Sequence, residues 1–194
     1  MDLTFRLGEA ADAPFLANCV TEVSQGVVEA LLDNLLPLVS ATKILTMVLQ
    51  DDSQAFSYKN CLLAHMGQDP KGLLFAYDAC EQKIPKILTT IASKTRLKPL
   101  EDLLTCQIPK TLYINTLWVS DDFRGEGLAD ALIDYAKDWA KSLQLTGLSL
   151  FAARNNTRAV KFYQRMGFVA RREVFIPETL QSKISAGDLY FCEL

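Results

Sequence analysis

A glycine-rich turn in the middle of the chain carries residue types that suit phosphate binding. The segment RGEG (124–127) follows an apolar run and precedes a long amphipathic pattern that begins at Leu128. Glycines let the backbone approach a ligand closely, and the free amides of a helix N-terminus attract anions. Glu126 and Asp130 could satisfy the same amides. The turn alone therefore leaves a phosphate ligand and a self-capped helix equally open.

Two standard nucleotide motifs are excluded at this turn. A Walker loop needs Gly-Lys followed by Ser or Thr, which the chain lacks. The dinucleotide pattern GxGxxG would require glycine at Asp130, within an early βαβ unit that the sequence does not predict.

A window of cationic residues follows the turn. Residues 151–172 contain six basic residues and no acid, whereas the whole chain has a formal net charge of −3. A local patch in an acidic protein suits a small polyanion better than a long nucleic acid, although solvated helix faces are the alternative. The six are Arg154, Arg158, Lys161, Arg165, Arg171 and Arg172.

The strand-like run LYINTLWV (112–119) changes its inward parity at residues 115–116. Such a slip is what a β-bulge produces. A bulge would bend the strand and leave backbone N–H and C=O groups free to pair with an extended ligand.

The elements that must position these features alternate between strand and helix patterns, which predicts a mixed α/β (α+β) fold with a helical insertion near residues 82–108. Strands are expected at 3–7, within 56–66 and 72–80 as a hairpin, and at 112–119, 146–153, 168–176 and 187–194. Helices are expected within 8–23, 27–36, 40–50, 84–93, 98–105, 128–143 and 155–166.

Length and composition predict one domain spanning residues 1–194, because a chain of 194 residues can bury a core without staples. The five cysteines are scattered and His65 is the single histidine, so neither disulfides nor a metal site are expected. The chain shows no signal-peptide pattern and no clean apolar run of membrane-spanning length. We therefore expect a cytoplasmic protein with no membrane or nucleic-acid partner.

Two motifs resemble the GNAT superfamily of acyl-CoA-dependent N-acyltransferases. RGEGLA (124–129) is similar to the family pattern (Q/R)xxGx(G/A), and NNTRAVKFYQRMGF (155–168) is similar to NxxAxxxYxxxGF. The first motif matches at Arg124, Gly127 and Ala129. The second matches at Asn156, Ala159, Tyr163, Gly167 and Phe168.

The resemblance implies a GNAT-like mixed sheet of about seven strands, splayed beside a bulged fourth strand, with acetyl-CoA in the opening. The pantetheine arm would pair with the backbone of Leu117, Trp118 and Val119. Asn156 would contact the cofactor, and Tyr163 would lie near the thioester sulfur. The pyrophosphate would sit on the amides of Arg124, Gly125, Glu126, Gly127, Leu128 and Ala129.

The implied activity is transfer of an acetyl group from acetyl-CoA to a primary amine, by direct attack through a tetrahedral intermediate. The backbone amide of Leu117 or its neighbour would hold the oxyanion, and Tyr163 would be the general acid. Tyr163 could instead be a buried structural residue of an apolar helix face. A catalytically silent acyl-CoA sensor and an unrelated anion-binding domain are the alternative functions.

The base and the acceptor stay open in the sequence. The fourth strand has no carboxylate, and Glu29, His65, Asp78 and Glu81 are the alternatives to direct attack by a neutral amine. We expect residues 20–52 and the insertion to wall the site of a small-molecule or protein amine. The net charge of −6 over residues 1–150 favours a cationic acceptor such as a polyamine. A homodimer is compatible with the sequence.

Overall fold

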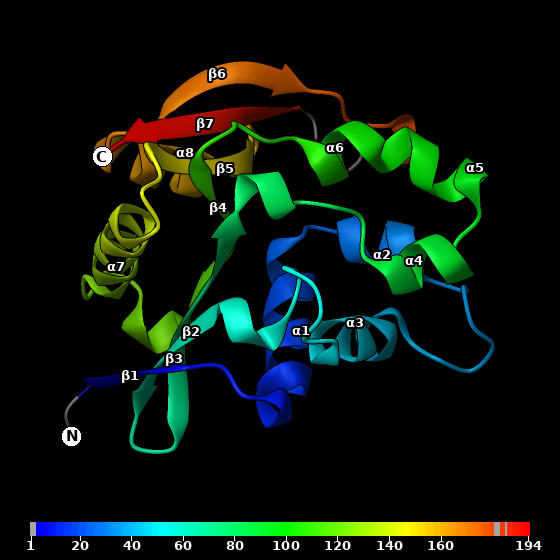
Figure 1. Cartoon of the computed structure of the whole chain (residues 1–194), viewed down its shortest axis with the longest axis horizontal. Helices are drawn as coiled ribbons and strands as arrows, with labels where there is room; N and C mark the ends of the chain where they lie inside the picture. The colour runs from blue at the N-terminus through cyan, green and yellow to red at the C-terminus, as the bar shows by residue number, and fades with distance from the viewer. Residues whose placement is uncertain (1–2, 181–182, 185) are drawn as a thin grey trace.

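A seven-stranded mixed sheet forms the centre of the molecule in the computed structural model, which describes residues 3–180, 183–184 and 186–194 (Figure 1). The strand order is β1-β2-β3-β4-β5-β7-β6. Only β4 and β5 run parallel, and every other neighbouring pair is antiparallel. The strands are β1 (Leu3–Leu7), β2 (Cys61–Met66), β3 (Asp69–Asp78), β4 (Thr111–Val119), β5 (Gly147–Ala153), β6 (Val169–Val174) and β7 (Gly187–Glu193). The predicted fold class and strand number are confirmed.

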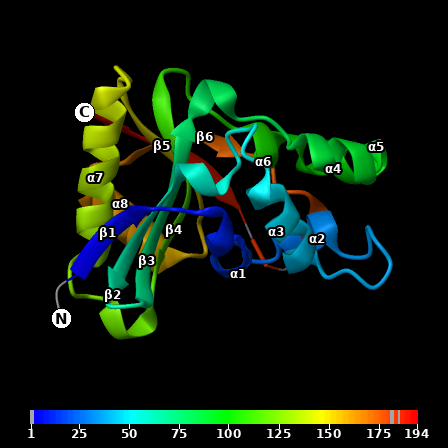
Figure 2. The same cartoon turned by 60° about the horizontal axis from the view of Figure 1, so that its bottom comes forward.

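Helices cover both faces of this sheet (Figures 1 and 2). One face packs against α7 and α8, and the other packs against α1, α2, α3 and the helical insertion, so the molecule has two apolar cores. Among the described residues, no helix is both long and apolar enough to cross a membrane. The helices are α1 (Ala13–Val23), α2 (Val27–Leu32), α3 (Ala41–Gln50), α4 (Lys86–Ile91), α5 (Lys94–Leu97), α6 (Glu101–Thr105), α7 (Leu128–Ser142) and α8 (Thr157–Arg165).

The β2–β3 hairpin is tighter at its turn than the sequence suggests. Residues 69–71 belong to β3, which leaves only Gly67 and Gln68 between the strands. Gly67 adopts a φ of +64°, and positive φ is what a two-residue hairpin loop requires. At the other end, residues 58–60 form a 3₁₀ turn, so β2 begins later than the apolar run does.

The bulge predicted in the fourth strand is present. In the β3–β4 ladder Phe75 pairs with Thr116 and the next residue pairs with Ile114, so Asn115 is the extra residue. On the other side, β4 pairs with β5 only from Thr111 to Ile114. The sheet therefore splays beyond the bulge, and the remaining half of β4 has one edge without a strand partner.

The helix that follows β5 ends in a Schellman motif. The amide of Phe168 donates to the carbonyl oxygen of Tyr163 (2.9 Å), and that of Gly167 donates to Gln164 (3.1 Å). Gly167 has a φ of +92°, which a glycine adopts without strain. The Gly-Phe pair that ends the second motif thus stops α8 and anchors Phe168 in the core.

Candidate active site

The turn before α7 presents unpaired backbone amides to open space. Gly125 and Gly127 have φ values of +96° and +82°, and a Cβ atom on either would meet no heavy atom within 4 Å. No side chain of the described residues caps the helix. Within the described ranges, the amides of Gly125, Gly127, Leu128 and Ala129 have no hydrogen-bond acceptor. This is the geometry of an anion-binding helix N-terminus.

Two of the six predicted amides are already used inside the turn. The amide of Arg124 donates to Asp121 and that of Glu126 donates to Phe123, each over 3.4 Å. The exposed side chain of Glu126 has no hydrogen bond or ion pair within the part of the chain that the structure describes. Four amides rather than six are therefore free for a ligand.

The arginine of this turn is tied to protein groups. Arg124 Nε donates to the carbonyl oxygen of Val119 (3.2 Å), and its guanidinium pairs with Asp121 and lies 3.7 Å from Glu22. The side chain thereby links the turn to the end of β4 and to α1. Arg124 shapes the site, but its charge is largely neutralised.

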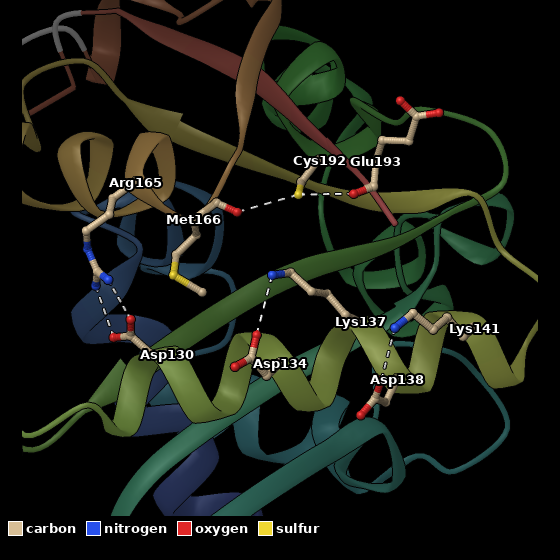
Figure 3. Close-up of polar contacts among 9 residues, drawn as sticks. All are labelled: Asp130, Asp134, Lys137, Asp138, Lys141, Arg165, Met166, Cys192 and Glu193. Atoms are coloured by element: carbon tan, nitrogen blue, oxygen red, sulfur yellow. Dashed lines mark hydrogen bonds and ion pairs between the residues drawn. The ribbon is translucent and has the colours of Figure 1, made fainter.

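The first turn of α7 is clamped to the end of α8 (Figure 3). Arg165 meets Asp130 in a two-pronged ion pair, with N···O distances of 2.6 and 3.0 Å. This hydrogen bonding lowers the pKa of the Asp130 carboxyl. The pair offsets a negative charge that would otherwise repel an anion at the turn.

The cationic window does not form one patch, which corrects the interpretation of the sequence. Arg154 pairs with Asp188 (2.5 Å), Arg172 pairs with Asp102 (2.8 Å), and Arg171 lies over the ring of Phe191. Arg158 lines the pocket in front of the glycine turn and has no acidic partner among the described residues. Free positive charge near the turn thus comes chiefly from this one arginine.

The open edge of β4 lies beside the turn. Leu117, Trp118 and Val119 line the same pocket and keep that edge unpaired toward β5. The Trp118 indole donates to Glu22 (2.9 Å) and packs edge-on against Phe15, with centroids 5.6 Å apart. The side chain of Trp118 is therefore held by α1, while its strand backbone stays available.

Asn156 and Tyr163 lie one above the other on α8. Asn156 is the N-cap, and its Oδ1 accepts from the amide of Ala159 (3.2 Å), while its Nδ2 has no acceptor among the described residues. The half-buried Tyr163 ring packs edge-on against Phe162 and Phe168. Its hydroxyl has no hydrogen-bond partner among the described residues, and burial raises the pKa of Tyr163 to about 12.

Two pockets meet at these two residues. An outer pocket of about 710 Å³ runs from the glycine turn past the β4 edge, and its volume is typical of a cofactor or ligand site. A smaller inner pocket of about 200 Å³ lies between the sheet, α1–α2 and the insertion. Both are lined by Val23, Gln25, Asn156, Ala159 and Tyr163. Tyr163 thus stands at the junction of two chemically different spaces.

Residues of both segments that the sequence assigned to the walls of the acceptor site line the inner pocket. Residues between 20 and 45 line one side, and residues between 82 and 104 line another. None of the four base candidates, Glu29, His65, Asp78 and Glu81, is among the described lining residues. His65 is instead a strand residue of β2, and Asp78 caps the turn after β3.

Sequence reasoning missed several residues of the outer pocket, among them three that are polar or charged. Glu22 and Gln25 lie near the end of α1, far from either motif in sequence. Arg158 was counted in the cationic window but not singled out. Its position in the first turn of a helix, two residues after Asn156, was the available signal.

The fold and this site define the class of protein. The model of the acetyltransferase (GNAT) family matches residues 46–168, which is more than half of the chain. The protein therefore belongs to the acetyltransferase (GNAT) family.

Particular relatives match shorter stretches of sequence. Streptothricin acetyltransferase of Escherichia coli is 44% identical over 55 residues, 28% of this chain and 32% of the relative. An uncharacterized N-acetyltransferase of Methanocaldococcus jannaschii is 36% identical over 61 residues, 31% of this chain and 27% of the relative. The chain thus aligns with about a third of the length of these relatives.

Among solved structures, an N-acetyltransferase of Staphylococcus aureus Mu50 superposes with a TM-score of 0.68 at 18% identity. The superposition covers 97% of this chain and 99% of that one. At this identity the likeness concerns the fold.

Proposed function

We propose that the protein is an N-acetyltransferase that moves the acetyl group of acetyl-CoA to a primary amine. The observation that carries the proposal is the meeting of the two pockets at Tyr163. The outer one has free amides and an open strand edge, and the inner one is smaller and lined mostly by apolar side chains. Membership of the acetyltransferase family supports the same activity.

The outer pocket fits acetyl-CoA in three places. The amides of Gly125, Gly127, Leu128 and Ala129 would bind the pyrophosphate, with Arg158 adding positive charge. The free backbone edge of Leu117–Val119 would pair with the pantetheine amides. The free Nδ2 of Asn156 would donate to the cofactor beside the junction.

Binding at the β4 edge would require one exchange. The carbonyl oxygen of Val119 accepts from Arg124 Nε, and a pantetheine N–H would share or replace that donor. Arg124 would then remain paired with Asp121 and Glu22, so no charge is left without a partner.

At the junction, a neutral amine would attack the thioester carbonyl. A C–N bond forms, the C–S bond breaks, the nitrogen loses a proton and the sulfur gains one. The backbone amide of Leu117 or its neighbour at the bulge would stabilise the oxyanion. Tyr163 would donate its hydroxyl proton toward the departing sulfur, because its raised pKa keeps it protonated.

One observation favours a second candidate, a catalytically silent acyl-CoA-binding module. The described lining of the inner pocket contains no carboxylate that could act as a base from that side. A sensor would need none. Direct attack by a neutral amine needs none either, so turnover distinguishes the two.

The test combines cofactor binding with thiol release. Acetyl-CoA at about 100 times its dissociation constant should stabilise the fold by about 2.7 kcal/mol and raise the melting temperature. With a panel of primary amines, free CoA thiol should appear only when acetyl-CoA, amine and protein are all present. Stabilisation without thiol release across the panel would favour the sensor, and no stabilisation would contradict the acetyl-CoA site.

A further inference from the structure

The residues that line the inner pocket indicate which kind of amine it accepts. Aromatic rings line it from three strands, β3 (Tyr77), β4 (Tyr113) and β5 (Phe151), and from the loop before β2 (Phe56). The Tyr77 and Tyr113 rings lie 5.9 Å apart, centroid to centroid. The remaining walls are mostly aliphatic side chains of α1, α2, α3 and the insertion. Such a space suits a flat apolar body.

Charge is the second observation. Among the described lining residues there is no Asp or Glu, and Lys83 is the single charged side chain. Lys83 is exposed and has no ion pair within the described part of the chain. A second ammonium group on the substrate would lose its hydration without meeting a carboxylate, and Lys83 would repel it.

We propose that the acceptor is an arylalkyl monoamine, whose apolar ring occupies the inner pocket while its amine points to Tyr163. This rests on the proposed acetyltransferase function. The proposal reverses the preference for a polyamine that the chain's net charge suggested, because the acids of residues 1–150 do not line this pocket.

The same pocket explains how the amine could become a neutral nucleophile without a general base. A primary amine has a reference pKa near ~10.4 and is protonated in water at neutral pH. Burial in an apolar space disfavours the ammonium form and lowers the pKa of the amine. The apolar wall therefore favours the neutral amine, as a carboxylate base would do in another site. Because less neutral amine is present at low pH, KM for the amine should be higher there.

The first experiment compares acceptors with the wild-type protein. Phenethylamine should exceed both putrescine and a lysine-containing peptide in kcat/KM by at least about tenfold, which corresponds to about 1.4 kcal/mol. Thiol release with putrescine or the peptide but not with phenethylamine would overturn this inference and leave the acetyltransferase proposal intact. No release with any amine would instead count against the acetyltransferase itself.

A charge reversal tests the role of Lys83. Lys83→Glu should raise kcat/KM for putrescine relative to that for phenethylamine several-fold. Lys86→Glu is the matched control, since Lys86 is exposed on the same insertion and does not line the pocket. Equal effects of both variants would show a general field effect and contradict a charge-selective pocket.

A filling variant tests what occupies the pocket. Leu104→Trp replaces an aliphatic side chain of the pocket lining with a large indole ring. Ile91→Trp makes the same kind of change at a partly buried residue of the insertion that does not line the pocket. Leu104→Trp should lower kcat/KM for phenethylamine at least tenfold and keep the acetyl-CoA melting shift, and Ile91→Trp should do neither. If Leu104→Trp instead blocks hexanoyl-CoA as donor and spares phenethylamine, the pocket holds acyl chains and the inference fails.

Discussion

The ring and the hydroxyl of Tyr163 have different roles: the ring packs in the fold, and the hydroxyl is assigned to the chemistry. Its ring packs against Phe162 and Phe168 in the α8 face, as the apolar spacing predicted. Its hydroxyl, in contrast, has no partner among the described residues at the junction of both pockets. The hydroxyl is not one of the buried polar atoms that lack a partner, so it is open to the pockets and a ligand in either one could bond to it.

Replacing Tyr163 by Phe should separate the structural role of the ring from the chemical role of the hydroxyl. The ring packing is retained, so the melting temperature and the dissociation constant for acetyl-CoA should stay close to those of the wild type. Loss of the proton donor should lower kcat by about 10²-fold. Steady-state kinetics measures kcat, and thermal unfolding measures the melting temperature. An unchanged kcat would contradict the role of Tyr163 as general acid.

The pKa of Tyr163 also predicts the shape of the pH profile. Because burial raises it to about 12, the hydroxyl stays protonated throughout the range in which assays are practical. The rate should therefore rise with pH as the amine loses its proton, without a falling limb between pH 7 and 10. A falling limb near pH 9 that disappears in Tyr163→Phe would contradict this.

Gly127 should matter for the ligand as well as for the backbone. Gly127→Ala forces a left-handed alanine, which costs about 1–2 kcal/mol, and places a Cβ in the space assigned to the pyrophosphate. The dissociation constant for acetyl-CoA should rise at least about tenfold.

Gly67→Ala is the matched control, because Gly67 also has a positive φ (+64°) but lies in the β2–β3 turn. It should lose similar stability in a denaturant titration with unchanged acetyl-CoA binding. Weaker binding in both variants would mean that general destabilisation, and not the loss of ligand space at the glycine turn, explains the effect.

Among the elements, β4 shows best what the sequence could predict. The parity slip at Asn115 is a local signal, so the bulge could be inferred from one run of residues. The glycine turn and the Asn156 cap are equally local. Pairings between distant segments could not be predicted from the sequence. Arg172 and Asp102 are 70 residues apart, and Trp118 and Glu22 are 96 residues apart. Nothing in the spacing of these residues reports their contact.

The Asp102–Arg172 pair fastens the insertion to β6. Asp102 accepts two bonds from Arg172 (2.8 and 3.2 Å) and one from the amide of Phe175 (2.7 Å). Asp102→Asn should lower the free energy of unfolding by about 1 kcal/mol or less, since the pair is partly exposed. It should also raise KM for the amine more than for acetyl-CoA, because the insertion walls the inner pocket.

The pH dependence of this effect has a definite sign. The bond from Arg172 lowers the pKa of Asp102 below its ordinary value of 3.8. The stabilisation is therefore complete above that value and is lost as the pH falls through the lower, folded-state pKa. The stability gap between Asp102→Asn and wild type should close in acid, and a gap that widens there would contradict the ion pair.

Over the whole molecule, the splayed sheet brings the two pockets together. The parting of β4 from β5 leaves an opening, with the glycine turn and α8 on one side and α1, α2 and the insertion on the other (Figure 2). Net charge was a poor guide to the ligand, because three of the six cations of residues 151–172 are paired with acids and the acids of residues 1–150 are not among the described residues that line the inner pocket. The acceptor preference therefore follows from the lining and not from the composition.

The most direct test follows both products of one reaction mixture. Acetyl-CoA and phenethylamine are incubated with the protein, while free CoA thiol and N-acetylphenethylamine are quantified together. We expect equal amounts of thiol and acetylated amine, both dependent on the protein and both reduced about 10²-fold in Tyr163→Phe. Thiol without acetylated amine would indicate hydrolysis, and the absence of both products with every primary amine tested, despite bound acetyl-CoA, would contradict acetyl transfer.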